Sequence, residues 1–254
     1  MTKLMGWGTL VIYLGPALGL TPHRNATAVL AVALDGRLEV ADDPASSNGT
    51  YRSTRSVLIP PNTLHHLRAS GNTMAFLYVD PFSRDLAALM QKMRHVTPRA
   101  AFDLVDESAI AGVLTGLAEG RTPLREGRDA LEKWLGIGMQ AKPDARISSA
   151  LQQMREQPGE LHSLDQLAAG AGLSASRFLH LFKAQTGIPL RRYRLWNRMV
   201  AAVRAWHGGM SLTDAAHSAG FASSAHFSAA FREMFGMMPS DLLDRLEPAS
   251  NTVH

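Results

Sequence analysis

The sequence predicts an α+β protein of two domains: a strand-rich sandwich or barrel that continues into helices, then an all-helical domain with two helix-turn-helix units. Three observations predict it. Short strand-like runs fill the first third, the apolar spacing lengthens after Pro81, and the last third contains one pattern twice. With 254 residues, of which 46% are hydrophobic, the chain is long enough for two ordinary domains.

The predicted strands lie between about residues 9 and 80, where apolar or alternating runs are separated by turn residues. Asp35-Gly36 is typical of a hairpin turn, and the polar stretch 42–50 is expected to be a loop. Closely spaced short strands favour a small sandwich or barrel. The runs are Thr9–Tyr13, Ala28–Leu34, Arg37–Val40, Ser56–Ile59 and Met74–Val79.

Helical spacing replaces the strand pattern over residues 82–94, 108–118 and 123–137. These helices either pack on the strands or form a dimer interface. We expect a first domain of residues 1–142, with its helices within about 82–140, and a linker at Gln140–Asp144. A second domain of residues 143–246 and a flexible tail of residues 247–254 complete the expected organisation. The apolar stripes are Leu86, Leu89, Met90 and Met93, and Leu131, Trp134 and Leu135.

The repeated pattern consists of Leu164–Leu173 and Leu212–Phe221, whose turn glycines Gly172 and Gly220 lie 48 residues apart. A second amphipathic segment follows each copy. Two short helices around a glycine turn indicate a helix-turn-helix, whose second helix can enter a DNA major groove. The expected units span about 163–184 and 212–235, with a linker helix over about 189–206. That helix would be about 27 Å long, which suits major-groove faces about 34 Å apart.

The charge distribution supports nucleic-acid binding independently. No acidic residue lies between Asp165 and Asp214, whereas seven basic residues do: Arg177, Lys183, Arg191, Arg192, Arg194, Arg198 and Arg204. Because the net charge of the whole chain is only +4, the basic character is concentrated here. Such a stretch attracts a polyanion. A solvated basic helix face is the alternative interpretation.

Candidate DNA-binding residues follow from the helical periodicity. In the first unit Ser163 and Ser174 are expected N-caps, and Phe178, Leu181 and Phe182 are expected to point inward. In the second unit only Arg232 of the expected exposed set carries a fixed charge, so we expect the first unit to contribute more of the specificity. The candidates are Ser176, Arg177, Leu179, His180, Lys183, Arg194, Arg198, Ser223, Ser224, His226, Ser228 and Arg232.

A longer motif extends over about Ile147 to Leu246 and resembles the AraC/XylS family of bacterial transcription regulators. It comprises Phe178-x3-Phe182-x4-Gly187-x-Pro189-x3-Tyr193-Arg194-x3-Arg198-Met199, then Ala219-Gly220-Phe221, Phe227-x3-Phe231-Arg232 and Phe235-Gly236-x2-Pro239. The resemblance implies two helix-turn-helix units on a shared linker helix and double-stranded DNA as partner. It places Ser176, Leu179, His180, Ser224, His226 and Ser228 at the bases. His180 stands where the family often has an arginine. Ala229 is a second departure, because it is small and uncharged at a potential contact site.

Members of that family often carry a cupin-like sensing domain, and Pro60-x-Asn62-x2-His65 resembles the second cupin motif. The first cupin motif is missing, and no carboxylate completes a metal site from His23, His65 and His66, so we expect neither metal nor cofactor. An effector pocket is the remaining role, with core packing as the alternative. Its candidate residues are His23, Val29, Ala31, Val57, Ile59, His65, Phe76 and Tyr78.

The sequence favours a sequence-specific transcription regulator that responds to an unknown small-molecule effector. A homodimer is expected, and RNA polymerase is a further candidate partner. The chain has no cysteine, which removes the usual indicator of redox compartment. Because glycines and a proline interrupt the apolar segment Trp7–Leu20, a cytoplasmic protein without a leader or membrane contact is expected. An enzyme is not expected, because no catalytic motif stands out. The alternatives are a cupin-type metal-dependent enzyme with an appended binding module, and a protein that binds an acidic protein partner.

Overall fold

The computed structural model describes residues 2–7, 10–45, 49–71, 73–79, 85–135, 144–157 and 162–246. The chain divides into a sheet unit, Met1–Gln140 with Arg232–Glu247, and a helical unit, Ala141–Phe231 with Pro248–His254. The grouping of Arg232–Glu247 with the sheet unit differs from the expected division of the chain. Residues 140–143 of the predicted linker, the tail, and residues 82–84 and 136–137 of two predicted helices lie outside the described residues.

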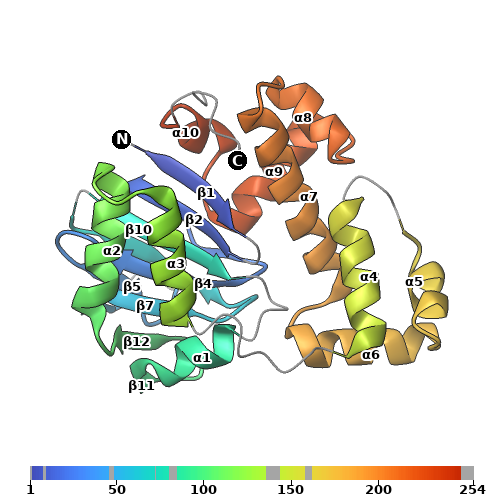
Figure 1. Cartoon of the computed structure of the whole chain (residues 1–254), viewed down its shortest axis with the longest axis horizontal. Coiled ribbons are helices and arrows are strands. Elements are labelled where there is room, and N and C mark those ends of the chain that lie inside the picture. The colour runs from blue at the N-terminus through green and yellow to red at the C-terminus, as the bar shows by residue number, and fades with distance from the viewer. Residues whose placement is uncertain are drawn as a thin grey trace. The chain divides into compact units, whose positions relative to one another are not determined.

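The strands of the sheet unit form three antiparallel sheets (Figure 1). The largest has the order β1-β2-β10-β4-β7-β12-β11, a second has the order β6-β5-β9, and β3 pairs with β8. The predicted strand-rich first part is therefore confirmed. The strand bounds are β1 Lys3–Trp7, β2 Leu10–Pro16, β3 His23–Arg24, β4 Ala28–Ala33, β5 Leu38–Ala41, β6 Tyr51–Thr54, β7 Ser56–Ile59, β8 Leu64–His65, β9 Leu67–Ala69, β10 Thr73–Val79, β11 Met93–Val96 and β12 Ala101–Leu104.

One prediction about the helices of the sheet unit was wrong. The segment 82–94 was expected to be helical to its end, but α1 spans Asp85–Gln91 and the chain then enters β11. Met93 pairs with Leu104 of β12 and is buried. A residue at position 93 can face the core from a strand as well as from a helix. The apolar spacing therefore did not distinguish a strand from a helix here. Helices α2, Glu107–Glu119, and α3, Leu124–Leu135, follow the predicted spacing closely.

The large sheet buries alternate residues on its two faces, as the pleat of a strand requires. Residues of one face form a single hydrophobic core with α1, α2 and α3, so the apolar stripes of these helices are used inside the unit. This favours the intramolecular role over the dimer interface for those stripes. The core includes Ile12, Leu14, Leu30, Val32, Leu77, Leu89, Ile110, Leu114, Leu117, Leu131 and Leu135.

The described residues from 144 to 246 are mainly helical, as predicted. A capped helix, α4, opens the helical unit, where the Asp144 side chain accepts a hydrogen bond from the backbone of Arg146. None of the helices in the described part of the chain is long and apolar enough to cross a membrane. The bounds are α4 Ala145–Glu156, α5 Leu164–Gly170, α6 Ala175–Thr186, α7 Leu190–His207, α8 Leu212–Ser218, α9 Ser224–Phe235 and α10 Pro239–Leu243.

Within the sheet unit, Gly236 at the end of α9 contacts the segment before β3. The backbone N–H and the hydroxyl of Thr21 both donate to the carbonyl oxygen of Gly236, at 2.8 and 2.9 Å. The ring of Phe235 meets the ring of Tyr78 edge to face, with centroids 5.6 Å apart. We call the contact of Thr21 with Gly236 the Thr21 clasp; it fixes the carboxy-terminal segment on the strands.

Gly236→Ala is expected to destabilise the protein for two reasons. Gly236 has φ +74°, which disfavours a side chain by about 1–2 kcal/mol. A Cβ there would also lie 2.5 Å from the carbonyl oxygen of Thr21, which is backbone and cannot rotate away. Gly120→Ala is the matched control, since Gly120 has φ +76° and its nearest neighbour is the Lys3 Nζ at 3.7 Å. Urea unfolding should show a larger loss for Gly236→Ala; equal losses would contradict the close contact.

Candidate functional site

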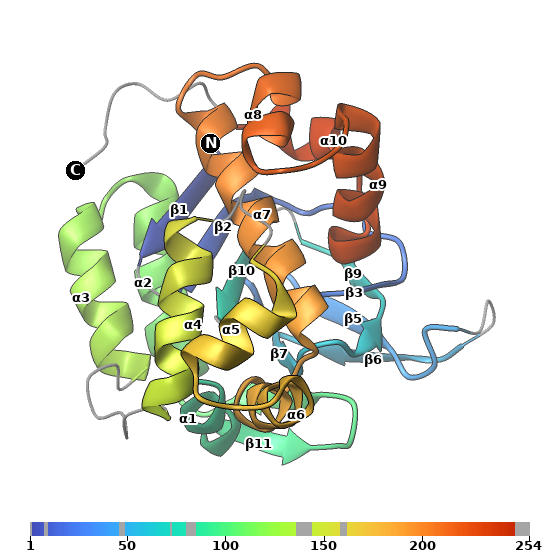
Figure 2. The same cartoon turned by 90° about the vertical axis from the view of Figure 1, so that its right-hand side faces the viewer.

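The first helix-turn-helix consists of α5 and α6 (Figure 2). Ser163 and Gln166 form a capping box at the start of α5, and the Ser174 hydroxyl accepts from the backbone N–H of Arg177 at the start of α6. Gly172 in the turn has φ +64°, a conformation that favours glycine. The sequence therefore determines both helix starts and the turn between them.

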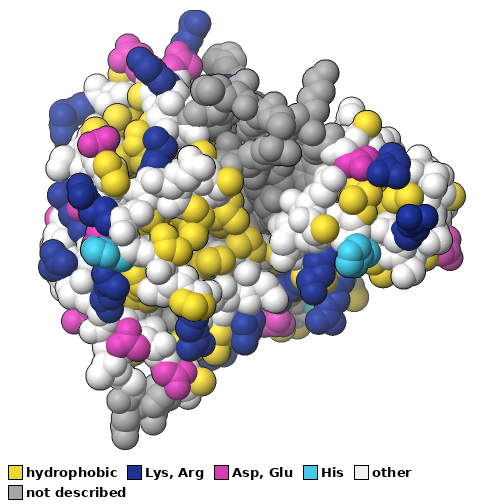
Figure 3. Space-filling view, turned by 90° about the horizontal axis from the view of Figure 1, so that it is seen from below, with side chains coloured by type: hydrophobic (Ala, Val, Ile, Leu, Met, Phe, Trp, Pro, Cys, Tyr) yellow, Lys and Arg dark blue, Asp and Glu magenta, His cyan; other side chains and the backbone are white. Residues whose placement is uncertain are grey.

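Helix α6 presents a buried aromatic side and an exposed polar side. The rings of Phe178 and Phe182 are fully buried, and Phe182 meets Tyr193 of α7 edge to face at 5.6 Å. Figure 3 views the side on which α6 lies in Figure 1 and shows Lys and Arg side chains and a histidine on the helical unit. The residues exposed on α6 include the five candidates Ser176, Arg177, Leu179, His180 and Lys183.

The second helix-turn-helix repeats this construction with α8 and α9. The Ser211 hydroxyl accepts from the backbone N–H of Asp214, and Gly220 in the turn has φ +80°. Phe221, Phe227 and Phe231 fill the interior. His226 and Arg232 are exposed, whereas Ser223, Ser224 and Ser228 are half-buried. The Ser223 hydroxyl accepts from the His226 backbone N–H at 3.0 Å, so it serves as a cap.

Helix α7 joins the two helix-turn-helix units. Two of its arginines bind backbone carbonyls elsewhere in the helical unit. The Arg194 guanidinium donates to the carbonyl oxygen of His162, one residue before the cap of α5. The Arg198 guanidinium donates to the carbonyl oxygens of Ala219, at 3.0 Å, and Gly220. Its carbon also lies 4.3 Å from the centroid of the Phe221 ring. Both arginines were predicted to bind DNA, which stays a prediction; in the structure their half-buried guanidinium groups bond backbone carbonyls.

The buried stripe of α7 also differs in part from the prediction. Tyr193 and Trp196 are buried as expected, but Met199 and Ala202 take the places expected for Val200 and Val203, which are half-buried. An α-helix has 3.6 residues per turn, so spacings of three and four are both compatible with one face. Contact with the neighbouring helices decided between them.

A protein-family model described as a helix-turn-helix domain matches residues 167–245. The transcriptional activator RhaS of Citrobacter koseri is 32% identical over 103 residues, which are 40% of this chain and 37% of the relative. The transcriptional activator RclR of Escherichia coli is 30% identical over 102 residues, 40% of this chain and 36% of the relative. The chain thus aligns with little more than a third of the length of these curated relatives.

The carboxy-terminal region is an AraC-type helix-turn-helix domain. This confirms the resemblance found in the sequence.

The fold of the whole chain is similar to that of ToxT from Vibrio cholerae, in a crystal structure described as unsaturated fatty acid bound. The TM-score is 0.61 at 12% sequence identity, and the comparison covers 98% of this chain and 99% of that one. ToxT therefore supports a fold in which a sheet-rich domain precedes a helical helix-turn-helix domain in the chain, as the sequence predicted. At this identity the similarity concerns the fold alone.

The sheet unit before the AraC-type domain contains the candidate effector residues. Val29, Ala31, Val57, Ile59, Phe76 and Tyr78 are all buried and alternate along their strands with residues of the helix-covered core. Register pairs Val29 with Ile59 and Tyr78, and Ala31 with Val57 and Phe76. The structure therefore brings these six residues together on the face of the large sheet opposite α2 and α3.

His23 and His65 pair across β3 and β8, with ring centroids 4.2 Å apart. Each Nδ1 lies near a backbone carbonyl oxygen, at 2.7 Å from Thr21 and 2.9 Å from Thr63, and can donate to it only when protonated. The amide of Asn25 lies 3.2 Å from the His65 Nε2 and donates to it. These contacts define the neutral tautomer with the proton on Nδ1.

His66 does not join this pair in a metal site. Its Nε2 lies 3.0 Å from the carbonyl oxygen of Leu20 and donates to it, and its Nδ1 accepts from the Tyr51 hydroxyl at 2.9 Å. Both ring nitrogens are therefore used within the protein. Among the described residues, no group of three or more His, Cys, Asp or Glu side chains could hold a metal ion.

Two polar residues near the histidine pair were missed from the sequence. The Asn25 Oδ1 and the Thr27 hydroxyl are buried and have no hydrogen-bond partner among the residues that the structure describes. A buried polar atom without a partner costs about 1–3 kcal/mol. Asn25 and Thr27 lie between β3 and β4, and their types alone gave no signal of burial.

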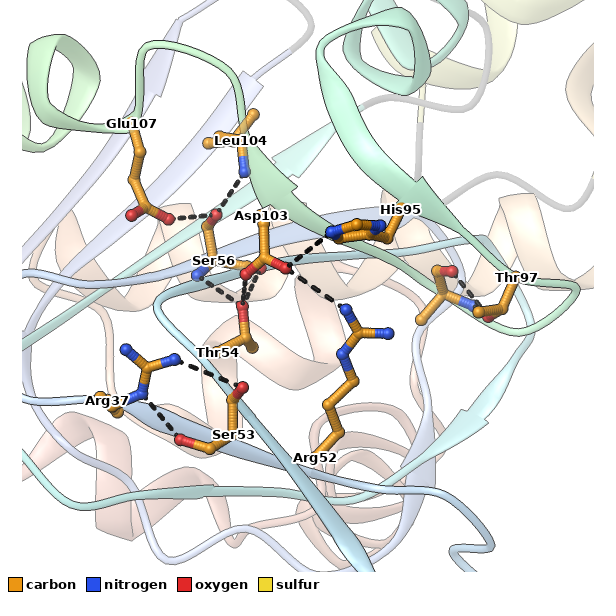
Figure 4. Close-up of polar contacts among 11 residues, drawn as sticks. Arg37, Arg52, Ser53, Thr54, Ser56, His95, Thr97, Asp103, Leu104 and Glu107 are labelled. Atoms are coloured by element: carbon orange, nitrogen blue, oxygen red, sulfur yellow. Dashed lines mark hydrogen bonds and ion pairs between the residues drawn. The ribbon is translucent and has the colours of Figure 1, made fainter.

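A separate polar cluster shows how Ser, His and Asp residues are arranged on β6, β7, β11 and β12 (Figure 4). The Asp103 carboxylate accepts from the Thr54 hydroxyl at 2.7 Å and lies 3.9 Å from the His95 Nε2. The buried Ser56 hydroxyl instead donates to Glu107, at 2.5 Å. Because the serine does not contact the histidine, the cluster connects the strands and is not a nucleophilic triad.

Arg198→Ala is expected to lower the free energy of unfolding by about 1–2 kcal/mol, because hydrogen bonds from a charged group to the carbonyls of Ala219 and Gly220 are lost. Arg191→Ala removes an exposed arginine of the same helix and is expected to cost less than about 0.5 kcal/mol. Urea unfolding of the full chain measures both. Equal effects would show that Arg198 does not support the AraC-type domain.

The buried histidines predict a loss of stability in acid. Burial lowers the pKa of His23 to about 4 and that of His65 to about 3, whereas the unfolded value is about 6.5. Below pH 6.5 the unfolded chain binds protons that the folded chain does not, so stability falls as the pH falls. Each histidine contributes about 1.4 kcal/mol per pH unit down to its folded pKa.

His65→Gln tests this, because glutamine can still accept from Asn25 but does not titrate. Urea unfolding of the wild type and the variant at pH 7 and pH 5 should show that the wild type loses about 2 kcal/mol more than the variant over this range. The comparison uses the change with pH, so a constant cost of the substitution cancels. Parallel pH dependences would contradict a neutral His65.

Proposed function

We propose that this chain is a sequence-specific regulator of transcription that binds double-stranded DNA through its two helix-turn-helix units. The observation that carries the proposal is the pair of similarly capped units in the AraC-type domain, one of them with an exposed basic helix. The relatives that match this region are named transcriptional activators. Their alignment is limited to this region, so the activity of the whole chain is part of the proposal.

In this proposal Arg177 and Lys183 of α6 bind phosphates, while Ser176 and His180 lie toward the base edges. In α9, His226 and Arg232 are exposed for the same roles, and Ser224 and Ser228 are half-buried beside them. Arg194, Arg198 and Ser223 act indirectly, because their contacts position helices. The first unit presents more fixed charge, which supports our expectation that it dominates binding.

The sheet unit is proposed to bind a small-molecule effector on the face that carries Val29, Ala31, Val57, Ile59, Phe76 and Tyr78, beside His23 and His65. The unpartnered Asn25 Oδ1 and Thr27 hydroxyl support a ligand with hydrogen-bonding groups, since such a ligand would satisfy them. The related fold of ToxT has been described with a bound unsaturated fatty acid. A cupin-like sensing role, a cytoplasmic homodimer and contact with RNA polymerase remain parts of the proposal.

Selection of bound duplexes from a random DNA pool tests the central claim. The full-length protein should enrich a bipartite motif whose blocks lie about one duplex turn, or roughly 34 Å, apart. Enrichment of no motif, with weak binding that is equal for all sequences, would overturn the proposal. An acidic protein partner would then be the stronger alternative.

Arg177→Ala and Lys183→Ala should each weaken DNA binding and reduce its salt dependence. Removal of one phosphate contact lowers the slope of log K against log salt by about 0.9. The matched control is Arg125→Ala, which removes an exposed arginine from α3 of the sheet unit and should leave the slope unchanged. Titrations of the selected duplex at several salt concentrations measure the slopes. If Arg125→Ala reduced the slope as much as Arg177→Ala and Lys183→Ala, the effect would be a nonspecific one of net charge.

A further inference from the structure

Leu179 is an exposed apolar residue on the helix proposed to enter the major groove. Its side chain has a relative exposure of 39%, whereas the preceding Phe178 and the following Phe182 are at 0%. Adjacent helical residues are about 100° apart around the helix axis, so Leu179 lies beyond the edge of the buried face. Packing of the AraC-type domain therefore covers only part of this large apolar side chain.

On the exposed side of α6, the neighbours of Leu179 are polar. Ser176 lies three residues before it and Lys183 four residues after it, which makes them its neighbours on the helix surface. His180 is exposed beside it. Of the other large hydrophobic residues that are similarly exposed in the described part of the chain, none lies on α6 or α9. They are Val96, Val105, Leu124, Met210 and Met238.

The major groove offers one apolar group to such a side chain. Its base edges present hydrogen-bond donors and acceptors, and thymine adds its 5-methyl group. We propose that Leu179 recognises a thymine in the first half-site through contact with this methyl group. The inference rests on the proposed function and adds to it the chemistry of one recognised base.

The second helix-turn-helix lacks this contact. Phe227 and Phe231 of α9 correspond to Phe178 and Phe182 of α6, so Ser228 occupies the position of Leu179. Ser228 is half-buried and ends in a hydroxyl, which gains little from a methyl group. Recognition of the methyl group is thus confined to the half-site that α6 reads, which distinguishes it from a general preference for A·T pairs.

Substitution of deoxyuridine for thymine tests the contact, because it removes the methyl group and preserves the base pair. Each thymine of the selected duplex is replaced in turn, and the affinity of the full-length protein is measured. Burial of one methyl group predicts a roughly four-fold loss of affinity at one thymine of the α6 half-site. The control Lys183→Ala should weaken binding to both duplexes and preserve that ratio.

Leu179→Ala provides the decisive comparison. It should bind the thymine and uracil duplexes about equally, whereas Leu179→Met, which keeps an apolar side chain of similar length, should retain most of the difference. A thermal melt of Leu179→Ala checks that the variant is folded. If the wild type binds the selected duplex but Leu179→Ala shows the same methyl dependence, the inference is overturned and the proposed function stands. If the wild type binds no duplex specifically, both are overturned.

Discussion

The helical unit depends on the guanidinium groups of α7 that bind backbone carbonyls. Arg194 and Arg198 lie four residues apart on one side of the helix, and each bonds the backbone of a different helix-turn-helix. Arg198 reaches carbonyls just after α8, where backbone acceptors have no partner within the helix. Partial burial lowers the pKa of both groups, which indicates that the carbonyls have replaced part of their hydration. The single helix α7 thereby holds both helix-turn-helix units.

This use of arginine changes how the basic stretch is understood. A charge pattern in a sequence shows where cations are concentrated, but it does not show which of them are already satisfied by the fold. Arg198 stacks on Phe221 and bonds two carbonyls, whereas Arg177 and Lys183 are exposed on α6. If the chain binds DNA as proposed, we therefore expect exposed residues such as Arg177 and Lys183 to make most of the phosphate contacts. The total of seven basic residues overstates the charge available to DNA.

The local features of the AraC-type domain could be predicted because they depend on neighbouring residues. Ser163, Ser174 and Ser211 cap helices, and Gly172 and Gly220 adopt the positive φ that the turns require. These choices follow from backbone chemistry within a few residues. The short, continuous apolar runs likewise identified β4 and β10, which are buried on both faces.

Features that join distant parts of the sequence could not be predicted in the same way. The contact of His162 with Arg194 connects residues 32 apart, and the Thr21 clasp connects residues 215 apart. Hydrophobicity also could not separate the two faces of the large sheet, because Leu30 and Val29 are equally buried. Only the fold shows that Leu30 packs under the helices and Val29 belongs to the opposite face.

Within the sheet unit, the Thr21 clasp joins the segment before β3 to the residue that follows α9. Gly236 accepts two hydrogen bonds from Thr21, and the Thr21 carbonyl in turn accepts from the ring of His23. The ring of His23 lies against that of His65, which bonds Asn25. An effector that bound beside Asn25 and moved either histidine would therefore disturb the contact that holds Gly236. Because Gly236 follows the last turn of α9, Asn25 and the end of that helix are connected within the sheet unit through the side chains of His65 and His23 and through Thr21.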